Sequence, residues 1–222
     1  MEERTAQRTR PPTERTRVRR LPERGVFDRA TIDAILDEAL ICHLAYVVDG
    51  QPRVIPTIHA RDGDVLYVHG SNASRTLRTA KGGTPVAVEV TLLDGLVLAR
   101  SAFHHSMNYR SVVMYGTARE ISDPDQKWRA QRALVEHVVH GRSNDARMPN
   151  DRELNQTTIL AVPLDEASAK IRTGPPKDED EDYGLPVWAG VVPLATVPGD
   201  PEPDPAMDAS VPEPDYLTPY RR

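Results

Sequence analysis

The sequence is poor in the residues on which disulfide-bonded, zinc-binding and membrane-spanning proteins depend. Its one cysteine, Cys42, excludes an intramolecular disulfide and the usual cysteine frames of zinc sites. Cys42 lies within the apolar stretch 41–45, which predicts a buried structural thiol and not a nucleophile. No apolar run approaches the roughly 20 residues that span a bilayer, and the charged N-terminus has no hydrophobic signal core. We therefore expect a cytoplasmic protein with no membrane contact.

The short motifs of hydrolases and metal enzymes are also missing. GxSxG, SxxK and HExxH do not occur, so nothing supports a serine nucleophile or a zinc protease site. Of the seven histidines, the neighbours His104 and His105 would point to opposite faces of an extended segment. His137 and His140 can share a helix face, but no acidic residue nearby completes a ligand set. The sequence thus predicts no metal site, although a heme held by one histidine stays open.

The formal net charge of −5 hides an asymmetry between the two ends of the chain. Residues 1–20 hold seven arginines and three glutamates, whereas eleven acidic residues lie from Lys177 onward. A basic arm can bind nucleic acid, but this one lacks interleaved aromatic residues, so we expect no nucleic-acid partner. The alternative is that arginine–carboxylate pairs hold the arm on the body or on a partner subunit.

Apolar periodicity predicts one helix followed by a series of short strands. Asp28 is a plausible cap for an amphipathic helix over 31–39. Two Asp-Gly pairs, at 49–50 and 62–63, mark tight turns. These turns join strands into an antiparallel meander, and more strands follow; the predicted strands cover 43–48, 53–59, 65–69, 86–91, 95–98, 109–121 and 157–162.

The remaining elements fix the predicted fold class. A helical turn is expected over 74–81, and a longer helix begins with Ser122 as its cap and ends near Gly141. Because strands outnumber helices and βαβ alternation is absent, we predict a mainly β protein built on an antiparallel barrel. Pro56 predicts an edge or a bulge in its strand.

The composition divides the chain into four parts. Eleven of the twenty prolines lie from residue 174 onward, which predicts an extended or disordered acidic tail. Trp188 lies in an apolar island within this region and is expected to dock on the barrel or on a partner. We predict a basic N-terminal arm over 1–24, a barrel domain over 25–173, a docked segment over 174–194 and a tail over 195–222.

The stretch 67–78 combines a strand, a loop of small residues and a helix start. Such a junction offers backbone N–H donors, hydroxyl groups and the guanidinium groups of Arg75 and Arg78, which together suit a phosphate dianion. The alternative is an ordinary capped helix with solvated arginines. The residues alone leave both interpretations open.

Three segments, taken in order and with their spacing, resemble the FMN-binding split-barrel family of pyridoxamine 5'-phosphate oxidase. Residues 53–58 (RVIPTI) lie where these oxidases have an arginine-led strand under the isoalloxazine ring. His69-Gly70 followed by Ser74-Arg75-Thr76 corresponds to their phosphate loop, and 110–116 (RSVVMYG) to their Arg-Gln-Val segment. The chain is most similar in style to the small flavin-binding and 5-nitroimidazole reductase proteins of this family.

The resemblance implies a split β-barrel that binds FMN at the twofold interface of a homodimer. It also implies hydride chemistry on a small-molecule substrate, with NAD(P)H as a possible donor. Because the flavin carries this chemistry, no protein acid or base is assigned, and His59 and His105 are only candidates. The residues that the resemblance places at the flavin are Arg53, Val54, Ile55, Pro56, Thr57, His69, Gly70, Ser71, Ser74, Arg75, Thr76, Arg110 and Ser111.

Departures from the oxidases narrow the functional prediction. Thr76 replaces a phosphate-binding lysine, Ser111 replaces a glutamine, and the C-terminal Trp/Arg pattern that holds pyridoxamine phosphate is missing. We therefore expect an FMN-dependent oxidoreductase of the nitroreductase or flavin-reductase kind, and not a vitamin B6 oxidase. The alternative is a non-catalytic protein that binds or senses flavin, and some relatives take the deazaflavin F420 or heme instead.

Overall fold

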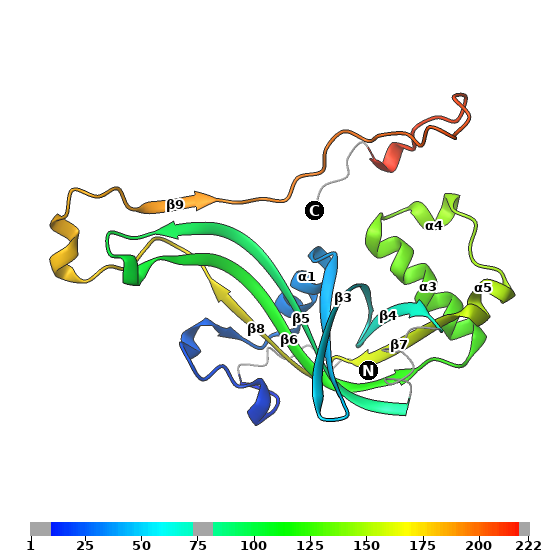
Figure 1. Ribbon diagram of the computed structural model, residues 1–222, viewed down its shortest axis with the longest axis horizontal. Helices are drawn as coiled ribbons and strands as arrows, with labels where there is room; N and C mark the ends of the chain where they lie inside the picture. The colour runs from blue at the N-terminus through cyan, green and yellow to red at the C-terminus, as the bar shows by residue number, and fades with distance from the viewer. Residues whose placement is uncertain (1–9, 73–81, 218–222) are drawn as a thin grey trace.

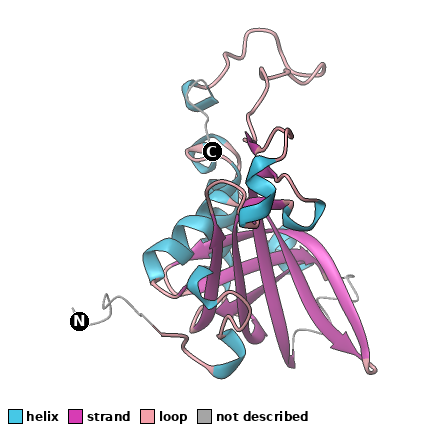
Figure 2. Cartoon of the chain, turned by 90° about the vertical axis from the view of Figure 1, so that its left-hand side faces the viewer, coloured by secondary structure: helices cyan, strands magenta, loops and turns pink. Residues whose placement is uncertain are grey.

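A computed structural model describes residues 10–72 and 82–217, which form one antiparallel sheet with a few helices around it (Figures 1 and 2). The strands are β1 (Gly25–Val26), β2 (Ile41–Val48), β3 (Gln51–Asp62), β4 (Val65–Ser71), β5 (Gly82–Leu98), β6 (Ser106–Glu120), β7 (Thr157–Pro163), β8 (Glu166–Arg172) and β9 (Gly190–Pro193). The α-helices are α1 (Arg29–Glu38), α3 (Pro124–Val138), α4 (Arg142–Asp145) and α5 (Asp151–Gln156). The predicted helical turn over 74–81 lies outside the described residues.

The sheet closes on itself through its two longest strands. The strand order is β1-β8-β6-β7-β4-β3-β2-β5-β9, and β5 also pairs with β6. The ring β6-β7-β4-β3-β2-β5 is therefore a barrel, while β1, β8 and β9 extend it. Residues 109–115 of β6 pair with β8, whereas residues 119–120 pair with β7. The barrel is therefore split along β6. The predicted mainly β split barrel is confirmed.

The first hairpins follow from local turn chemistry. Asp49 and Gly50 both have positive φ, at 50° and 72°, as a type I′ turn requires, and they join β2 to β3. Gly63, with φ 59°, joins β3 to β4. The predicted meander is confirmed, with β3 longer than expected. Pro56 pairs with His43 of β2, while β4 pairs only with residues 59–62 of β3, so Pro56 lies on an edge as predicted.

Helix α1 packs one of its faces against the core of the barrel. The Asp28 carboxylate accepts a hydrogen bond from the Thr31 N–H at 2.9 Å, which confirms the predicted cap. Ile32, Ile35 and Leu36 are buried on one face of the helix and meet the inward side chains of the strands. Cys42 is among these inward residues and is fully buried, so its predicted structural role agrees with its place in the core.

Burial makes the Cys42 thiol unreactive, which gives a first testable prediction. Desolvation raises the pKa of the Cys42 thiol to about 12, so almost no nucleophilic thiolate exists at pH 8. Native protein should not react with a thiol reagent such as Ellman's reagent at pH 8, whereas protein in denaturant should release one equivalent. Rapid reaction of the native protein would contradict the buried position.

Several elements differ from the sequence-based expectation. The strands predicted at 86–91 and 95–98 are one strand, β5, with a register shift between Leu93 and Gly95. The cap of α3 is Asp123 and not Ser122, because the Asp123 carboxylate accepts from the Gln126 N–H at 2.8 Å. This helix ends at Val138, and Gly141, with φ 91°, instead precedes α4. Five short elements were not predicted; they are β1, β8, β9, α4 and α5.

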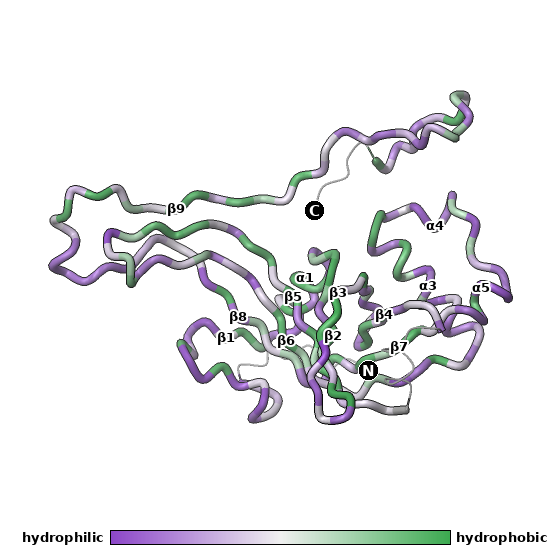
Figure 3. Tube along the Cα trace, viewed as in Figure 1, coloured by the Kyte–Doolittle hydropathy of each residue, from purple (hydrophilic) through white to green (hydrophobic). Residues whose placement is uncertain are grey.

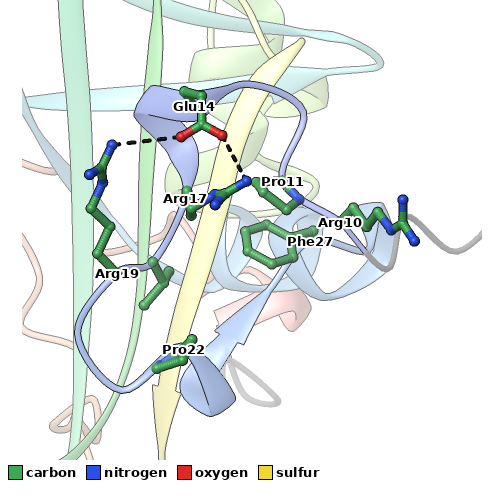
Figure 4. A pocket seen from close by; sticks show the side chains of 8 residues that line it. Arg10, Pro11, Glu14, Arg17, Arg19, Pro22 and Phe27 are labelled. Carbon is green, nitrogen blue, oxygen red and sulfur yellow. Dashed lines mark ion pairs between the residues drawn. The ribbon is translucent and has the colours of Figure 1, made fainter.

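The described part of the N-terminal arm lies on the body. Arg15 forms an ion pair with Glu166 of β8, and its guanidinium carbon lies 5.1 Å from the ring centroid of Tyr115. The arm encloses a hollow of about 830 Å³ whose wall includes Arg10, Arg17 and Arg19 (Figure 4). Glu14 pairs with two of these arginines, Arg17 at 2.7 Å and Arg19 at 3.6 Å. The ion pair between Arg15 and Glu166 therefore joins this part of the arm to the body, as expected if arginine–carboxylate pairs hold the arm.

The β5–β6 hairpin projects beyond the barrel and carries β9 along its edge (Figure 1). Phe103 near its tip is 88% exposed, and Trp188 is 66% exposed in a segment that contains apolar stretches (Figure 3). The Trp188 side chain therefore does not dock on the barrel of its own chain, and its docking on a partner stays a prediction. From β9 the chain crosses back over the molecule and reaches the α3–α4 corner, where Tyr216 accepts a hydrogen bond from Arg142 at 2.9 Å. Among the described residues, no helix is long and apolar enough to cross a membrane.

Candidate functional site

The outward face of β3, β2, β5 and β6 is open in the single chain. Residues that pair across strands share a face, so His43 lies beside Pro56 on one side and Glu89 on the other. Glu89 in turn lies beside Val113 of β6. Residues of the opposite parity, such as Leu44, Val88 and Met114, are buried in the barrel. We call the outward face the open face.

Polar groups occupy the middle of the open face. The His43 ring nitrogen Nδ1 lies 3.3 Å from a carboxylate oxygen of Glu89, which also accepts a hydrogen bond from the Thr91 hydroxyl. Thr91 pairs with Ser111, whose hydroxyl donates to the Lys170 carbonyl at 3.3 Å. The open face thus offers a carboxylate, hydroxyls and, from β8, the amine of Lys170. Such groups can hydrogen-bond the polar edge of an aromatic ligand.

Exposed aliphatic side chains border these polar groups. Ile41 and Val47 of β2 are 52% and 58% exposed, and Val54 and Ile58 of β3 are 61% and 39% exposed. Ile41 pairs directly with Ile58 across the two strands. A cluster of exposed aliphatic residues on a sheet is typical of a surface that a ligand or another subunit covers.

The structure separates the predicted residues 53–57 by strand parity. Val54 and Pro56 lie on the open face, on which Ser111 also lies. Ile55 packs against the core, and Arg53 and Thr57 share its parity, opposite to that of the open face. Two strands, β2 and β5, lie between β3 and β6, so Ser111 is roughly 14 Å from this segment at the usual strand spacing.

Arg110 is bound within its own chain. Its guanidinium forms hydrogen bonds with Asp94 at 2.8 and 3.0 Å and with Glu38, the last residue of α1, at 2.8 Å. The hydrogen bonds with Glu38 and Asp94 raise the pKa of Arg110 further above its already high ordinary value. Arg110 therefore links α1 to the β5–β6 hairpin, and its predicted contact with a flavin stays a prediction.

Asn72, at the end of β4, is anchored just before the loop that is predicted to bind phosphate. The Asn72 N–H donates to the Gln156 carbonyl at 3.0 Å, and its side-chain amide donates to the Asn155 carbonyl and accepts from the Thr158 hydroxyl. These bonds fix the chain directly after Gly70 and Ser71. The predicted residues Ser74, Arg75 and Thr76 lie outside the described residues.

His69 lies away from the open face's polar groups, beneath α3. It borders a cavity between the helix and strands β3 and β4, next to Ile58 and Leu134. Burial lowers the pKa of His69 below its ordinary value, and its Nδ1 is buried with no hydrogen-bond partner among the described residues.

The two histidines considered as acid–base candidates lie elsewhere. His59 is fully buried in the barrel, with Nε2 2.9 Å from the Leu36 carbonyl oxygen. His105 lies at the base of the exposed hairpin tip, with Nδ1 3.0 Å from the Ser101 carbonyl oxygen. Within residues 10–72 and 82–217, no three histidine, cysteine or acidic side chains gather as a metal site would require.

The barrel matches a known protein family. The family described as pyridoxamine 5'-phosphate oxidase matches residues 28–171, which include β2 to β7 and most of β8. The chain belongs to this family. A search among curated proteins found no match.

Two solved structures of the family's fold match almost the whole chain. The flavocytochrome Anf3 from Azotobacter vinelandii is 38% identical, with a TM-score of 0.89 over 95% of this chain and 98% of its own. An FAD- and heme-binding protein from Mycobacterium smegmatis is 39% identical, with a TM-score of 0.84 over 88% of this chain and 96% of its own.

A third structure shares the family's fold at lower identity. It is a candidate 5-nitroimidazole antibiotic resistance protein from Bacteroides thetaiotaomicron, 21% identical, with a TM-score of 0.56 over 66% of this chain and 86% of its own. This likeness supports the split barrel alone. The first two matches extend past the residue range of the family match, so they include the β9 segment or the N-terminal arm as well.

Proposed function

We propose that this protein binds a flavin and a heme and works as a redox protein through these two cofactors. The observation that carries the proposal is the 38% identity with a flavocytochrome over 95% of the chain. A second relative at 39% identity is named for FAD and heme together. The proposal favours the cofactor-binding alternative over a nitroreductase, whose support in the comparisons is limited to the fold.

The open face is the proposed position of the flavin ring. Its polar centre of Glu89, Thr91 and Ser111 can satisfy the heteroatom edge of an isoalloxazine, while Val54 and Ile58 can cover the apolar part. The loop after Asn72, with the basic residues Arg75 and Arg78, is the proposed phosphate site. The protein would then hold and orient the flavin, which supplies the hydride or electron chemistry.

The open face is also the proposed twofold interface of a homodimer. Exposed valine and isoleucine side chains on β2 and β3 are what an isologous contact would bury. The projecting hairpin and the β9 segment, with the exposed Phe103 and Trp188, are suited to reach around a second subunit. A flavin between two subunits would be shielded on both sides of its ring.

The relatives, and not the resemblance to the oxidases, indicate which flavin to test first. The Mycobacterium relative is named for FAD, so FAD is the first flavin to test, and the FMN expected from the motifs is the second. The missing lysine at position 76 weakens the analogy with the FMN-binding oxidases.

The visible spectrum of the purified protein tests this proposal. We expect twin flavin bands together with a Soret band, and a flavin that extraction and chromatography identify as FAD or FMN. Protein that is colourless and takes up neither added flavin nor hemin would contradict the proposal. Turnover of a nitroaromatic compound with NAD(P)H would instead favour the catalytic alternative.

A further inference from the structure

The cavity beneath α3 combines an apolar wall with one imidazole and one cation. Its volume is about 260 Å³, and it lies between the helix and the outer side of β3 and β4. Most of its wall is aliphatic, and a single imidazole, a single amide and a single guanidinium interrupt it. The lining residues are Ile58, His69, Gln131, Leu134, Val135, Val138, Val139 and Arg142. An apolar cavity with one imidazole nitrogen and one cation in its wall suits an apolar molecule that carries a metal and carboxylates.

His69 is the imidazole of this cavity, and its bonding is incomplete. Its Nδ1 is buried and has no hydrogen-bond partner among the described residues. A buried polar atom without a partner is unusual in a native structure and points to a missing ligand. Burial also lowers the pKa of His69, so the ring is neutral at pH 7 and keeps the lone pair that a metal requires.

Each of the other six histidines already has a partner in the chain. His59 and His137 lie near the backbone carbonyls of Leu36 and Ala39, at 2.9 and 2.8 Å, and His105 lies 3.0 Å from the Ser101 carbonyl. The remaining histidines lie 3.2 to 3.4 Å from glutamate oxygens; they are His43, His104 and His140. The His59 Nδ1 is buried in the same way as the His69 Nδ1, but His59 lies in the packed core of the barrel. Among the described residues, His69 is the histidine that combines such a nitrogen with a place in the wall of this cavity.

The rim of the cavity is suited to the charged edge of a heme. Arg142, at the start of α4, can form a charge-assisted pair with a propionate carboxylate. Its guanidinium is steadied by the Tyr216 hydroxyl at 2.9 Å, so the C-terminal segment reaches this rim. On the other side, Ile58 is 39% exposed and pairs with the exposed Ile41, which continues the apolar surface from the cavity to the open face.

We propose that His69 is an axial ligand of the heme iron, with one edge of the porphyrin in the cavity beneath α3 and Arg142 beside a propionate. This rests on the proposed function, which supplies the heme, and it adds the ligand and the place. The family resemblance assigned His69 to the flavin phosphate, whereas this proposal assigns it to the site of a second cofactor. The cavity then adjoins the open face through Ile58, so the two cofactors lie on neighbouring surfaces of one sheet.

The test compares full-length wild-type protein with His69→Gly, titrated with hemin and followed by the Soret band and by electron paramagnetic resonance. We expect His69→Gly to weaken heme binding by about tenfold or more and to change the signals that report the axial ligand. Added imidazole should restore both, because the glycine leaves room for it. His140→Gly is the matched control, since its side chain is 98% exposed and it lies two residues before Arg142 in the sequence.

The outcomes separate the ligand assignment from the proposed function. If wild type binds flavin but no heme, the heme half of the proposed function fails. If wild type binds heme and His69→Gly binds it with unchanged affinity and unchanged spectra, only the assignment of His69 fails. Circular dichroism and flavin content check that the variant folds, and rescue by imidazole would itself show an intact barrel.

Discussion

Val54→Glu is expected to yield a monomer that has lost most of its flavin. Val54 is 61% exposed in the single chain and lies on the open face, one strand from Val47, which is 58% exposed. If this face is the dimer interface, the substitution places a carboxylate where two apolar surfaces meet. Burial of an unpaired charge costs several kcal/mol, which is enough to dissociate an ordinary homodimer at micromolar concentration. Size-exclusion chromatography with light scattering gives the mass, and absorbance gives the flavin content.

Val197→Glu is the matched control for this experiment. Val197 is also an exposed valine, at 77%, but it lies in the extended segment after β9 and away from the open face. The control should remain dimeric with full flavin. A Val54→Glu protein that is dimeric and fully loaded with flavin would refute the assignment of the open face as the dimer interface.

Leu44→Ala is expected to cause a large loss of stability. Leu44 is fully buried, and its strand lies between β3 and β5 in the ring. Removal of its methyl groups costs the transfer free energy and leaves a cavity, together about 2–5 kcal/mol. Because a domain of this size has a total stability of about 5–15 kcal/mol, the loss is a large fraction. The expected fall in melting temperature is roughly 5–15 °C.

Leu185→Ala provides the comparison for the core substitution. Leu185 is 45% exposed in the segment before β9, so its truncation should change the free energy of unfolding by less than about 0.5 kcal/mol. Urea unfolding of both variants measures the difference. A Leu44→Ala protein within 1 kcal/mol of wild type would mean that the barrel interior is looser than the buried areas indicate.

Local chemistry explains why much of the fold could be predicted from the sequence. Asp49-Gly50 has the pair of residues that a type I′ turn needs, and Asp28 is followed by the pattern of an amphipathic helix. Strand β8 escaped prediction because its Glu-Ala-Ser-Ala-Lys-Ile-Arg sequence mixes small and charged residues without clear alternation. Its position is set by partners at both edges, β6 and β1, and these contacts are invisible in a short window.

The candidate site shows the same limit more strongly. The segments at 53–57 and 110–111 could be located by motif, but their orientation could not. Arg110 is turned toward Glu38 and Asp94, which lie 72 and 16 residues away in sequence. Lys170 was missed because β8 was missed. His69 was found by its place in a motif, whereas its buried, unpartnered nitrogen appears only once α3 is folded over it.

The pairing of β1 with β8 has a consequence for how the chain is made. The ring closes only when β7, which ends at Pro163, pairs with β4 and β6. Gly25 lies opposite Lys170, and Arg110 of β6 lies opposite Ile171, so the whole sheet cannot be completed until residues near 172 are synthesised. Such long-range pairing slows folding, because a large loop must close before its contacts form. During synthesis, the apolar strands β2 to β4 would leave the ribosome before their partner strands and would expose an unpaired edge. Chaperones that hold exposed strands should therefore associate with nascent chains of this protein until β8 emerges.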